Sequence, residues 1–202
     1  MSSHRFLRTS LALAGCALTL AFAACNTTPR PRGVDNEGLV VGRLAAVNPL
    51  DVVVLKPENH TGRNDVPLEL LRRELQAELV ALRYSPLALE YVDKNIVPAS
   101  YRPGALGEQG VLQVFVTGWD DSHWRSNSRL VIDADIYLLD AADPQTDRAL
   151  WGGHVTRTLE MAAANNATAT PDSLMRQAVA RFVDETLASL PARNPEKPTT
   201  KP

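Results

Sequence analysis

The chain is poor in cysteine, and both of its cysteines lie near its start. Cys16 and Cys25 precede the polar run that begins at Asn26, and no cysteine follows. The body of the chain therefore has no partner for an intramolecular disulfide and no thiolate to bind a metal. We expect the folded domain to hold neither a disulfide framework nor a cysteine metal site.

The sequence also lacks a strong charge of either sign. Its formal net charge at pH 7 is −2. Without residues 1–24, which carry Arg5 and Arg8, 19 basic residues stand against 23 acidic ones, and the net charge becomes −4. A mildly acidic domain lacks the basic surface that nucleic acids require. We therefore expect no nucleic-acid partner.

Motifs for catalysis and for phosphate binding are missing as well. The sequence has no G-x-S-x-G and no H-E-x-x-H, and the loop from Glu58 to Asp65 has one glycine and no Lys-Ser/Thr pair to hold a phosphate. His60, His123 and nearby acids are the residues that a hydrolase or a metal-dependent enzyme would use. A zinc site, however, usually needs three or four converging ligands. We expect no catalytic residue, metal or cofactor, and we keep the enzyme as an alternative that convergence of the two histidines would favour.

The first apolar run is too short to span a membrane but is typical of an export signal. Arg5 and Arg8 precede a Leu/Ala-rich run from Thr9 to Ala24, which is shorter than the roughly 20 residues of a spanning helix. Residues 1–24 are therefore predicted to be a signal peptide. The small residues before a cysteine resemble a bacterial lipoprotein signal, which implies that the cysteine carries a lipid.

Two cysteines compete for this role. LAGC, ending at Cys16, matches the lipoprotein pattern better, whereas Phe22 in FAAC is a departure from it. Cutting at Cys16 would leave a very short apolar core and keep ALTLAFAA on the mature protein, so we predict lipidation of Cys25, with Cys16 as the alternative. A plain secretory peptide cut after Ala24 is a further reading. Because Asn26 is not acidic, the resemblance implies an outer-membrane anchor, with the domain facing the periplasm.

Composition divides the remaining chain into a linker, one domain and a tail. Residues 25–38 and 191–202 are polar or rich in proline and bury too little apolar surface to offset the entropy of ordering. We predict a lipidated linker at 25–38, a single domain at 39–190 and a disordered tail at 191–202.

Hydrophobic periodicity predicts an α+β fold for this domain. Apolar residues at spacings of three and four predict helices from Val66 to Leu82, capped by Asp65, and from Asp172 to Leu190, capped by Thr170. Strands are expected at 51–56, 87–92, 111–119, 129–140 and 148–160, and a short helix within 97–110. The two long helices should cover one face of a mostly antiparallel sheet of about five strands, whose last three form a meander.

Two loops contain the candidate contact residues. Asn59 and Thr61 lie between the first strand and the first helix, where their side chains can bond their own backbone. Trp119 and Trp124 flank a turn at 118–128 and are rigid anchors of the kind enriched at protein interfaces. We predict these four residues as partner-binding. An apolar cleft lined by Trp119, Trp124 or Trp151 would instead indicate a small envelope ligand such as a glycan fragment.

Four segments in order resemble a superfamily of envelope lipoproteins. They are KPENHTGRNDVPLELLRREL, RYSPLALEYVDKNI, LGEQGVLQVFVTGWD and IYLLDAADPQTDRALW. The superfamily includes the curli secretion lipoprotein, the lipoprotein activators of penicillin-binding proteins, and a group of small envelope lipoproteins of unknown function, which is the most similar. The turn ADPQTD departs from the usual Thr-Gly, and nothing resembles the amphipathic hairpins of the curli channel, so no pore is expected.

This resemblance implies both a fold and a role. The fold would be similar to the amino-terminal domain of the Tol-Pal system's propeller protein. The role would be non-catalytic assembly, docking or regulation of envelope machinery. The partner would be an unidentified periplasmic or envelope protein, or further copies of the chain.

Overall fold

The computed structural model describes residues 34–35, 39–97, 100–145, 148–161 and 170–197. The chain divides into two units, Met1–Pro31 and Arg32–Pro202, and every described residue belongs to the second. The predicted signal peptide and Cys25 therefore lie outside the described residues. No helix in the described ranges is both long and apolar enough to cross a membrane.

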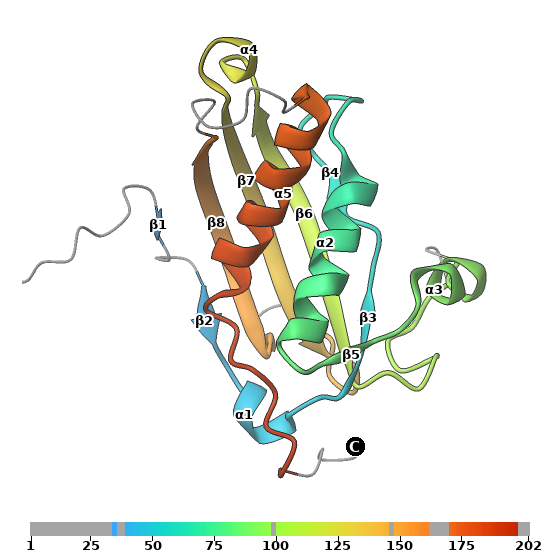
Figure 1. Ribbon diagram of the computed structural model, residues 1–202. Helices are drawn as coiled ribbons and strands as arrows, with labels where there is room; N and C mark the ends of the chain where they lie inside the picture. Colours follow the sequence, from blue (N-terminus) through green and yellow to red (C-terminus); the bar gives the residue numbers. More distant parts are fainter. Residues whose placement is uncertain (1–33, 36–38, 98–99, 146–147, 162–169, 198–202) are drawn as a thin grey trace, which may run out of the picture. The chain divides into compact units, whose positions relative to one another are not determined.

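A mixed sheet with a long antiparallel centre organises the second unit (Figure 1). Strands β6 (Gly110–Asp120), β7 (Arg129–Asp140) and β8 (Trp151–Glu160) form the predicted antiparallel meander. Beyond β6, β3 (Asp51–Val54) and β4 (Glu58–Asn59) both run parallel to it, and β5 (Ser85–Pro86) pairs with β3. The sheet is thus mostly antiparallel, with a parallel region at one side.

At the other edge of the sheet, two short strands from the beginning of the described chain pair with β8. Strands β1 (Val34–Asp35) and β2 (Val40–Val41) both pair antiparallel with β8. β1 falls within the segment expected to be a linker. Two-residue strands are too short to produce an alternating pattern, which explains why the sequence indicated about five strands and the sheet contains eight.

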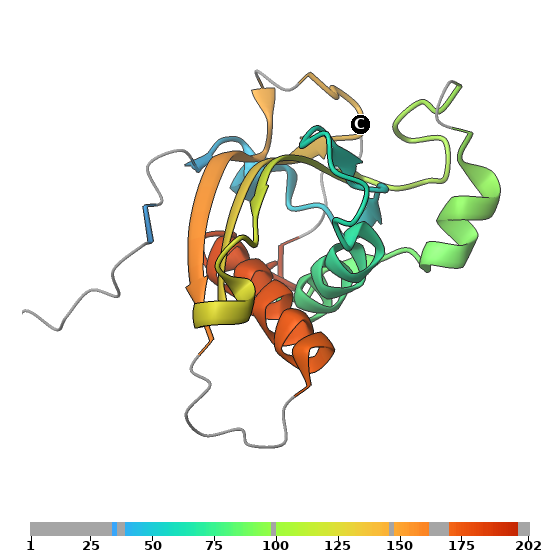
Figure 2. The ribbon, with the colours of Figure 1, turned by 90° about the horizontal axis from the view of Figure 1, so that it is seen from above.

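The two predicted long helices cover one face of the sheet (Figure 2). Helices α2 (Leu68–Ala81) and α5 (Pro171–Leu187) bury their apolar stripes against alternate residues of the strands. The shared core contains Leu71, Leu75, Leu79, Val52, Val54, Leu112, Leu130, Ile132, Ile136, Trp151, Val155, Phe182 and Val183. This arrangement confirms the predicted α+β class.

Helix α5 begins as the sequence predicts. The Thr170 hydroxyl oxygen accepts a hydrogen bond from the Ser173 amide at 3.2 Å, and Pro171 occupies the first turn. A side-chain acceptor at this position satisfies an amide that has no partner within the helix. The predicted cap is confirmed, although the helix ends at Leu187, before the expected Leu190.

Helix α2 begins differently from the prediction. It starts at Leu68, after Pro67, without a side-chain cap. The predicted cap, Asp65, instead binds the Arg63 guanidinium through both carboxylate oxygens, at 2.9 and 2.6 Å. Charge-assisted bidentate bonds are stronger than a single bond to a backbone amide, so the prediction of Asp65 as the cap was wrong.

The segment after α2 is helical where a strand was expected. Only Ser85 and Pro86 form a strand, and α3 (Leu89–Asn95) follows directly. The prediction of a strand at 87–92 was wrong because Leu89, Val92 and Ile96 are also spaced by three and four, and short apolar runs fit either period. The short helix expected within 97–110 is absent from its described part, 100–110. Two more short helices complete the described chain: α1 (Leu44–Val47) and α4 (Trp124–Asn127).

The described part of the expected tail is hydrogen-bonded to the domain. The Asn48 side-chain amide donates to the carbonyls of Asn194 and Lys197 at 3.0 and 2.7 Å. The Arg193 amide donates to the Leu82 carbonyl at 2.9 Å. We expected 191–202 to be disordered, but residues 191–197 lie along the domain, because backbone hydrogen bonds replace the apolar contacts that their composition lacks.

Candidate functional site

The loop after β4 is a turn held by its own polar groups. The Asn59 carboxamide oxygen accepts from the Thr61 amide at 3.1 Å and from the Thr61 hydroxyl at 2.7 Å. The Thr61 hydroxyl oxygen accepts from the Arg63 amide at 3.1 Å, and the Asn59 amide donates to the Arg63 carbonyl. These bonds confirm that Asn59 and Thr61 bond within their own loop. Their contact with a partner stays a prediction.

Arg63 joins this loop to the turn between β6 and β7. Its guanidinium donates to both carboxylate oxygens of Asp121, at 2.8 and 3.1 Å, in addition to Asp65. The Arg63 hydrogen bond holds the pKa of Asp65 below its usual range. The two candidate loops, 58 residues apart between Arg63 and Asp121, thus lie side by side at one end of the sheet.

The histidines of the enzymatic alternative have separate surroundings. His60 contacts Glu58 at 3.4 Å, and its ring lies 5.5 Å from that of Phe115. His123 is exposed at the start of α4. No hydrogen bond or ion pair in the described ranges joins the two imidazoles, and these ranges contain no group of three or more His, Cys, Asp or Glu side chains placed to bind a metal.

The tryptophans contribute to the core of the domain rather than to a cleft. Trp119 and Trp151 are buried in the main apolar cluster, and Trp124 packs partly buried against it. Trp119 therefore has little surface to offer in the single chain, and Trp124 has more. Their contact with a partner stays a prediction.

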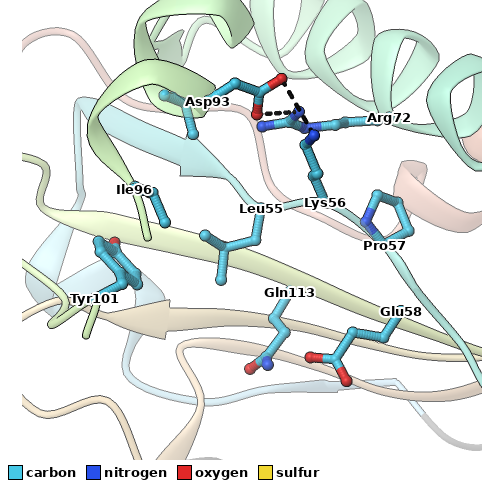
Figure 3. Close-up of a pocket in the computed structure, with 10 residues that line it drawn as sticks. Leu55, Lys56, Pro57, Glu58, Arg72, Asp93, Ile96, Tyr101 and Gln113 are labelled. Atoms are coloured by element: carbon cyan, nitrogen blue, oxygen red, sulfur yellow. Dashed lines mark hydrogen bonds and ion pairs between the residues drawn. The ribbon is translucent and has the colours of Figure 1, made fainter. Parts of the chain in front are cut away.

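A cavity of about 610 Å³ lies at the parallel side of the sheet, where α3 stands beside β3 (Figure 3). We call it the α3 cavity. It is lined by Leu55, Lys56, Pro57, Glu58, Arg72, Val92, Asp93, Ile96, Tyr101 and Gln113. Its walls come from the segment after β3, from β4, α2 and α3, from the loop that follows α3, and from β6. Its volume is in the range of small-molecule sites, roughly 300–1,000 Å³.

A buried arginine forms one wall of the α3 cavity. The Arg72 side chain is fully buried, and its Nε and Nη2 donate to the Val54 carbonyl at 3.1 and 2.9 Å. Its Nη1 donates to Asp93 on α3 at 2.7 Å. A buried guanidinium must be paired to be tolerated, so this contact fixes α3 against the sheet edge. Lys56 adds a second cation, 3.7 Å from the other Asp93 oxygen.

A buried acid orders the loop on the opposite wall. Glu108 accepts from the amides of Gly104 and Leu106, each at 2.8 Å, and from the Tyr101 hydroxyl. Burial and this hydrogen bond raise the pKa of Tyr101 well above its usual value. The phenol therefore stays neutral at physiological pH, and its ring forms part of the cavity wall.

Sequence reasoning missed this site for an identifiable reason. In the predicted helix from Val66 to Leu82, Arg72 lies next to the apolar stripe, where a charged residue is normally solvated. Its partner Asp93 directly follows the segment predicted as a strand, 87–92. Only the correct helical interpretation of 89–95 would have placed an acid opposite that arginine.

The fold and the α3 cavity define the chain as a two-layer α+β domain with a ligand-sized cavity at its sheet edge. No protein-family model matches the chain, and no curated protein matches it.

Solved structures show limited similarity. The PelC dodecamer from Paraburkholderia phytofirmans has a TM-score of 0.47 at 16% identity, covering 77% of this chain and 96% of that one. Lipoprotein GNA1162 from Neisseria meningitidis has a TM-score of 0.45 at 18% identity, covering 70% and 99%. Protein XCC0632 from Xanthomonas campestris, of the family DUF330, has a TM-score of 0.42 at 13% identity, covering 68% and 81%.

These values are too low to assign the chain to a family. The relation to the curli and penicillin-binding-protein activator lipoproteins stays a prediction. So does the similarity to the amino-terminal domain of the Tol-Pal propeller protein.

Proposed function

We propose that the chain is a non-catalytic lipoprotein of the outer membrane whose domain docks an envelope protein on the periplasmic side. The export signal and the small residues before Cys25 support the anchor. Eight residues separate Cys25 from β1, a reach of roughly 30 Å when extended. A partner would therefore lie on or close to the same membrane.

The observation that carries this proposal is the exposed apolar surface of α3. Tyr91 on α3 is 48% exposed, and Val97, two residues past the end of α3, is 62% exposed. Both lie beside the residues of this segment that line the α3 cavity. Single exposed apolar residues are ordinary. Here, however, they accompany a concave site on a helix that stands away from the α2/α5 layer in both views (Figures 1 and 2), and apolar surface beside a concavity favours binding.

Photo-crosslinking in intact cells tests the docking surface. A photoreactive phenylalanine at Tyr91 should give a defined adduct, whereas the same probe at Val80, which is 59% exposed on α2, should not. An adduct at twice the mass of the chain would identify a second copy as the partner. Equal adducts at both positions, or none at Tyr91, would contradict docking through α3.

The anchor is tested separately by lipid labelling. A chain with Cys25→Ala should lose labelling by a palmitate analogue and leave the membrane fraction, and Cys16→Ala should behave like the native chain. Loss of labelling in Cys16→Ala alone would move the anchor to Cys16. No labelling of the native chain would favour a plain secretory peptide cut after Ala24.

A second function is favoured by the α3 cavity itself. Its volume is in the range of sites for small molecules, and its lining combines apolar side chains with charged and amide groups that can orient a ligand. The domain would then bind an envelope ligand, alone or as a signal to its partner. The cavity differs from the tryptophan-lined cleft expected from the sequence, because those side chains pack in the core.

A further inference from the structure

We propose that the α3 cavity binds a short peptide whose two ends are free, with its carboxylate near Lys56 and Arg72 and its ammonium near Glu58 and Gln113. This inference rests on the second proposed function, that the cavity holds a ligand, and it adds the chemistry of that ligand.

One end of the α3 cavity carries an excess of positive charge. Arg72 and Lys56 face a single carboxylate, Asp93, at 2.7 and 3.7 Å. The guanidinium stays charged at any physiological pH. The Lys56 ammonium is 61% exposed and lies beyond hydrogen-bond distance of Asp93, so its three donors can turn to a ligand. An incoming carboxylate would neutralise the excess charge.

The other end offers acceptors. Figure 3 shows Glu58 and Gln113 together, away from the group formed by Lys56, Arg72 and Asp93. Glu58 is 54% exposed, and its carboxylate lies 3.4 Å from the His60 imidazole. A carboxylate and an amide oxygen are acceptors for the three hydrogens of an ammonium group. The cavity is thus polarised, cationic toward α3 and acidic toward β4.

The middle of the α3 cavity is apolar. Leu55 lies between the two charged ends in Figure 3, with Ile96 and Tyr101 beside it. Because the Tyr101 hydroxyl already binds Glu108, the phenol presents its ring to this space rather than a donor. A ligand with opposite charges at its ends and an apolar side chain between them matches all three regions, and a short peptide has this chemistry.

Nuclear magnetic resonance on the full unlipidated Cys25→Ala chain tests the match. The probes are the tripeptide Ala-Leu-Ala and its amino-acetylated, carboxy-amidated and doubly blocked forms, followed through the amides of Leu55 and Gln113. The free peptide should bind tightest. Each single block should weaken binding by about threefold, the size of one solvent-exposed ion pair.

Three variants then test which side chain binds which charged end of the peptide. In Lys56→Ala the free and amidated peptides should bind alike, and in Glu58→Gln the free and acetylated peptides should bind alike. Arg73→Ala removes an exposed arginine of α2 outside the cavity and should leave the ranking unchanged. These exposed side chains can change without loss of the fold, unlike Arg72.

The outcomes distinguish the inference about the charged ends of the peptide from the broader proposal that the cavity holds a ligand. Equal binding of the free and doubly blocked peptides would overturn the inference about charge and leave the cavity as an apolar ligand site. If none of the four peptides shifts the cavity amides, the inference fails, and short peptides are excluded as the ligand of the second proposed function. Neither result bears on the crosslinking test of docking.

Discussion

The antiparallel meander and the parallel edge of the sheet next to α3, which we call the α3 side, are stabilised by different interactions. In β6, β7 and β8, long antiparallel strands bury one apolar face under α2 and α5. Beyond β6, short parallel strands, a seven-residue helix and a buried arginine replace them. The first region is held by apolar burial, whereas the second depends on polar contacts and contains the cavity. Regular packing thus fills space in one region, and irregular packing leaves space in the other.

Removing a large core side chain should have the largest effect. Phe182→Ala leaves a cavity between α5 and the meander and should lower the free energy of unfolding by about 3–5 kcal/mol. Val80→Ala, at an exposed position, should change it by less than about 0.5 kcal/mol. Urea unfolding measures both. Similar losses in the two variants would contradict the packing of α5 on the sheet.

Breaking the buried ion pair should have a smaller effect, confined to the α3 side. Asp93→Asn keeps an oxygen acceptor but removes the negative charge that pairs with the Arg72 guanidinium. A fully buried pair costs about 3–5 kcal/mol to break. Because Asp93 is 36% exposed, we expect about 2 kcal/mol, together with faster amide exchange in α3 and unchanged exchange in β7. Lys56→Ala should cost less than about 1 kcal/mol. Uniform exchange changes would mean that the two regions unfold as one.

The helix starts provide a finer comparison. Thr170→Ala removes the acceptor for the Ser173 amide and should cost about 1 kcal/mol. Asp65→Ala should leave the thermal unfolding of α2 unchanged, because Asp65 binds Arg63 and does not cap that helix. Circular dichroism melts test both variants. A matching loss in Asp65→Ala would restore it as a cap.

The smallest effect concerns alkaline pH, where Tyr84 connects α2 to the carboxyl-terminal segment. Burial raises the pKa of Tyr84 to about 12, from 10.0 in an exposed tyrosine. Below pH 10 both the folded and unfolded chains keep this proton. Between pH 10 and about 12 only the unfolded chain loses it, so stability falls over this window. In Tyr84→Phe this contribution to the fall should be absent, and an unchanged pH dependence in urea unfolding would contradict the assignment.

The sequence predicted the regular region well for a physical reason. In β7, alternate residues from Leu130 to Leu138 are apolar, and only a strand buried on one face has this period. The predicted helices are likewise confirmed because their stripes extend over several turns. Their boundaries differ by a few residues, since caps depend on local competition such as that between Arg63 and the α2 amides for Asp65.

The α3 side was not predictable from the same signals. Segment 85–97 is too short for its periodicity to separate strand from helix. The pairing of Arg72 with Asp93 depends on tertiary contact, and no local pattern marks it. The candidate site therefore came from the structure, whereas the turn formed by Asn59 and Thr61 was predictable because its bonds are local.

The short strands at the two edges of the sheet protect these edges from pairing with other copies of the chain. An open strand edge is a template on which other chains can aggregate. β1 and β2 pair with both halves of β8. On the other side, β5 pairs with Val52, and the Arg72 guanidinium binds the outward Val54 carbonyl. At these positions the hydrogen-bonding groups of the edge strands are already occupied. Even at high local concentration, one copy of the chain therefore cannot add a strand to the sheet of another copy there.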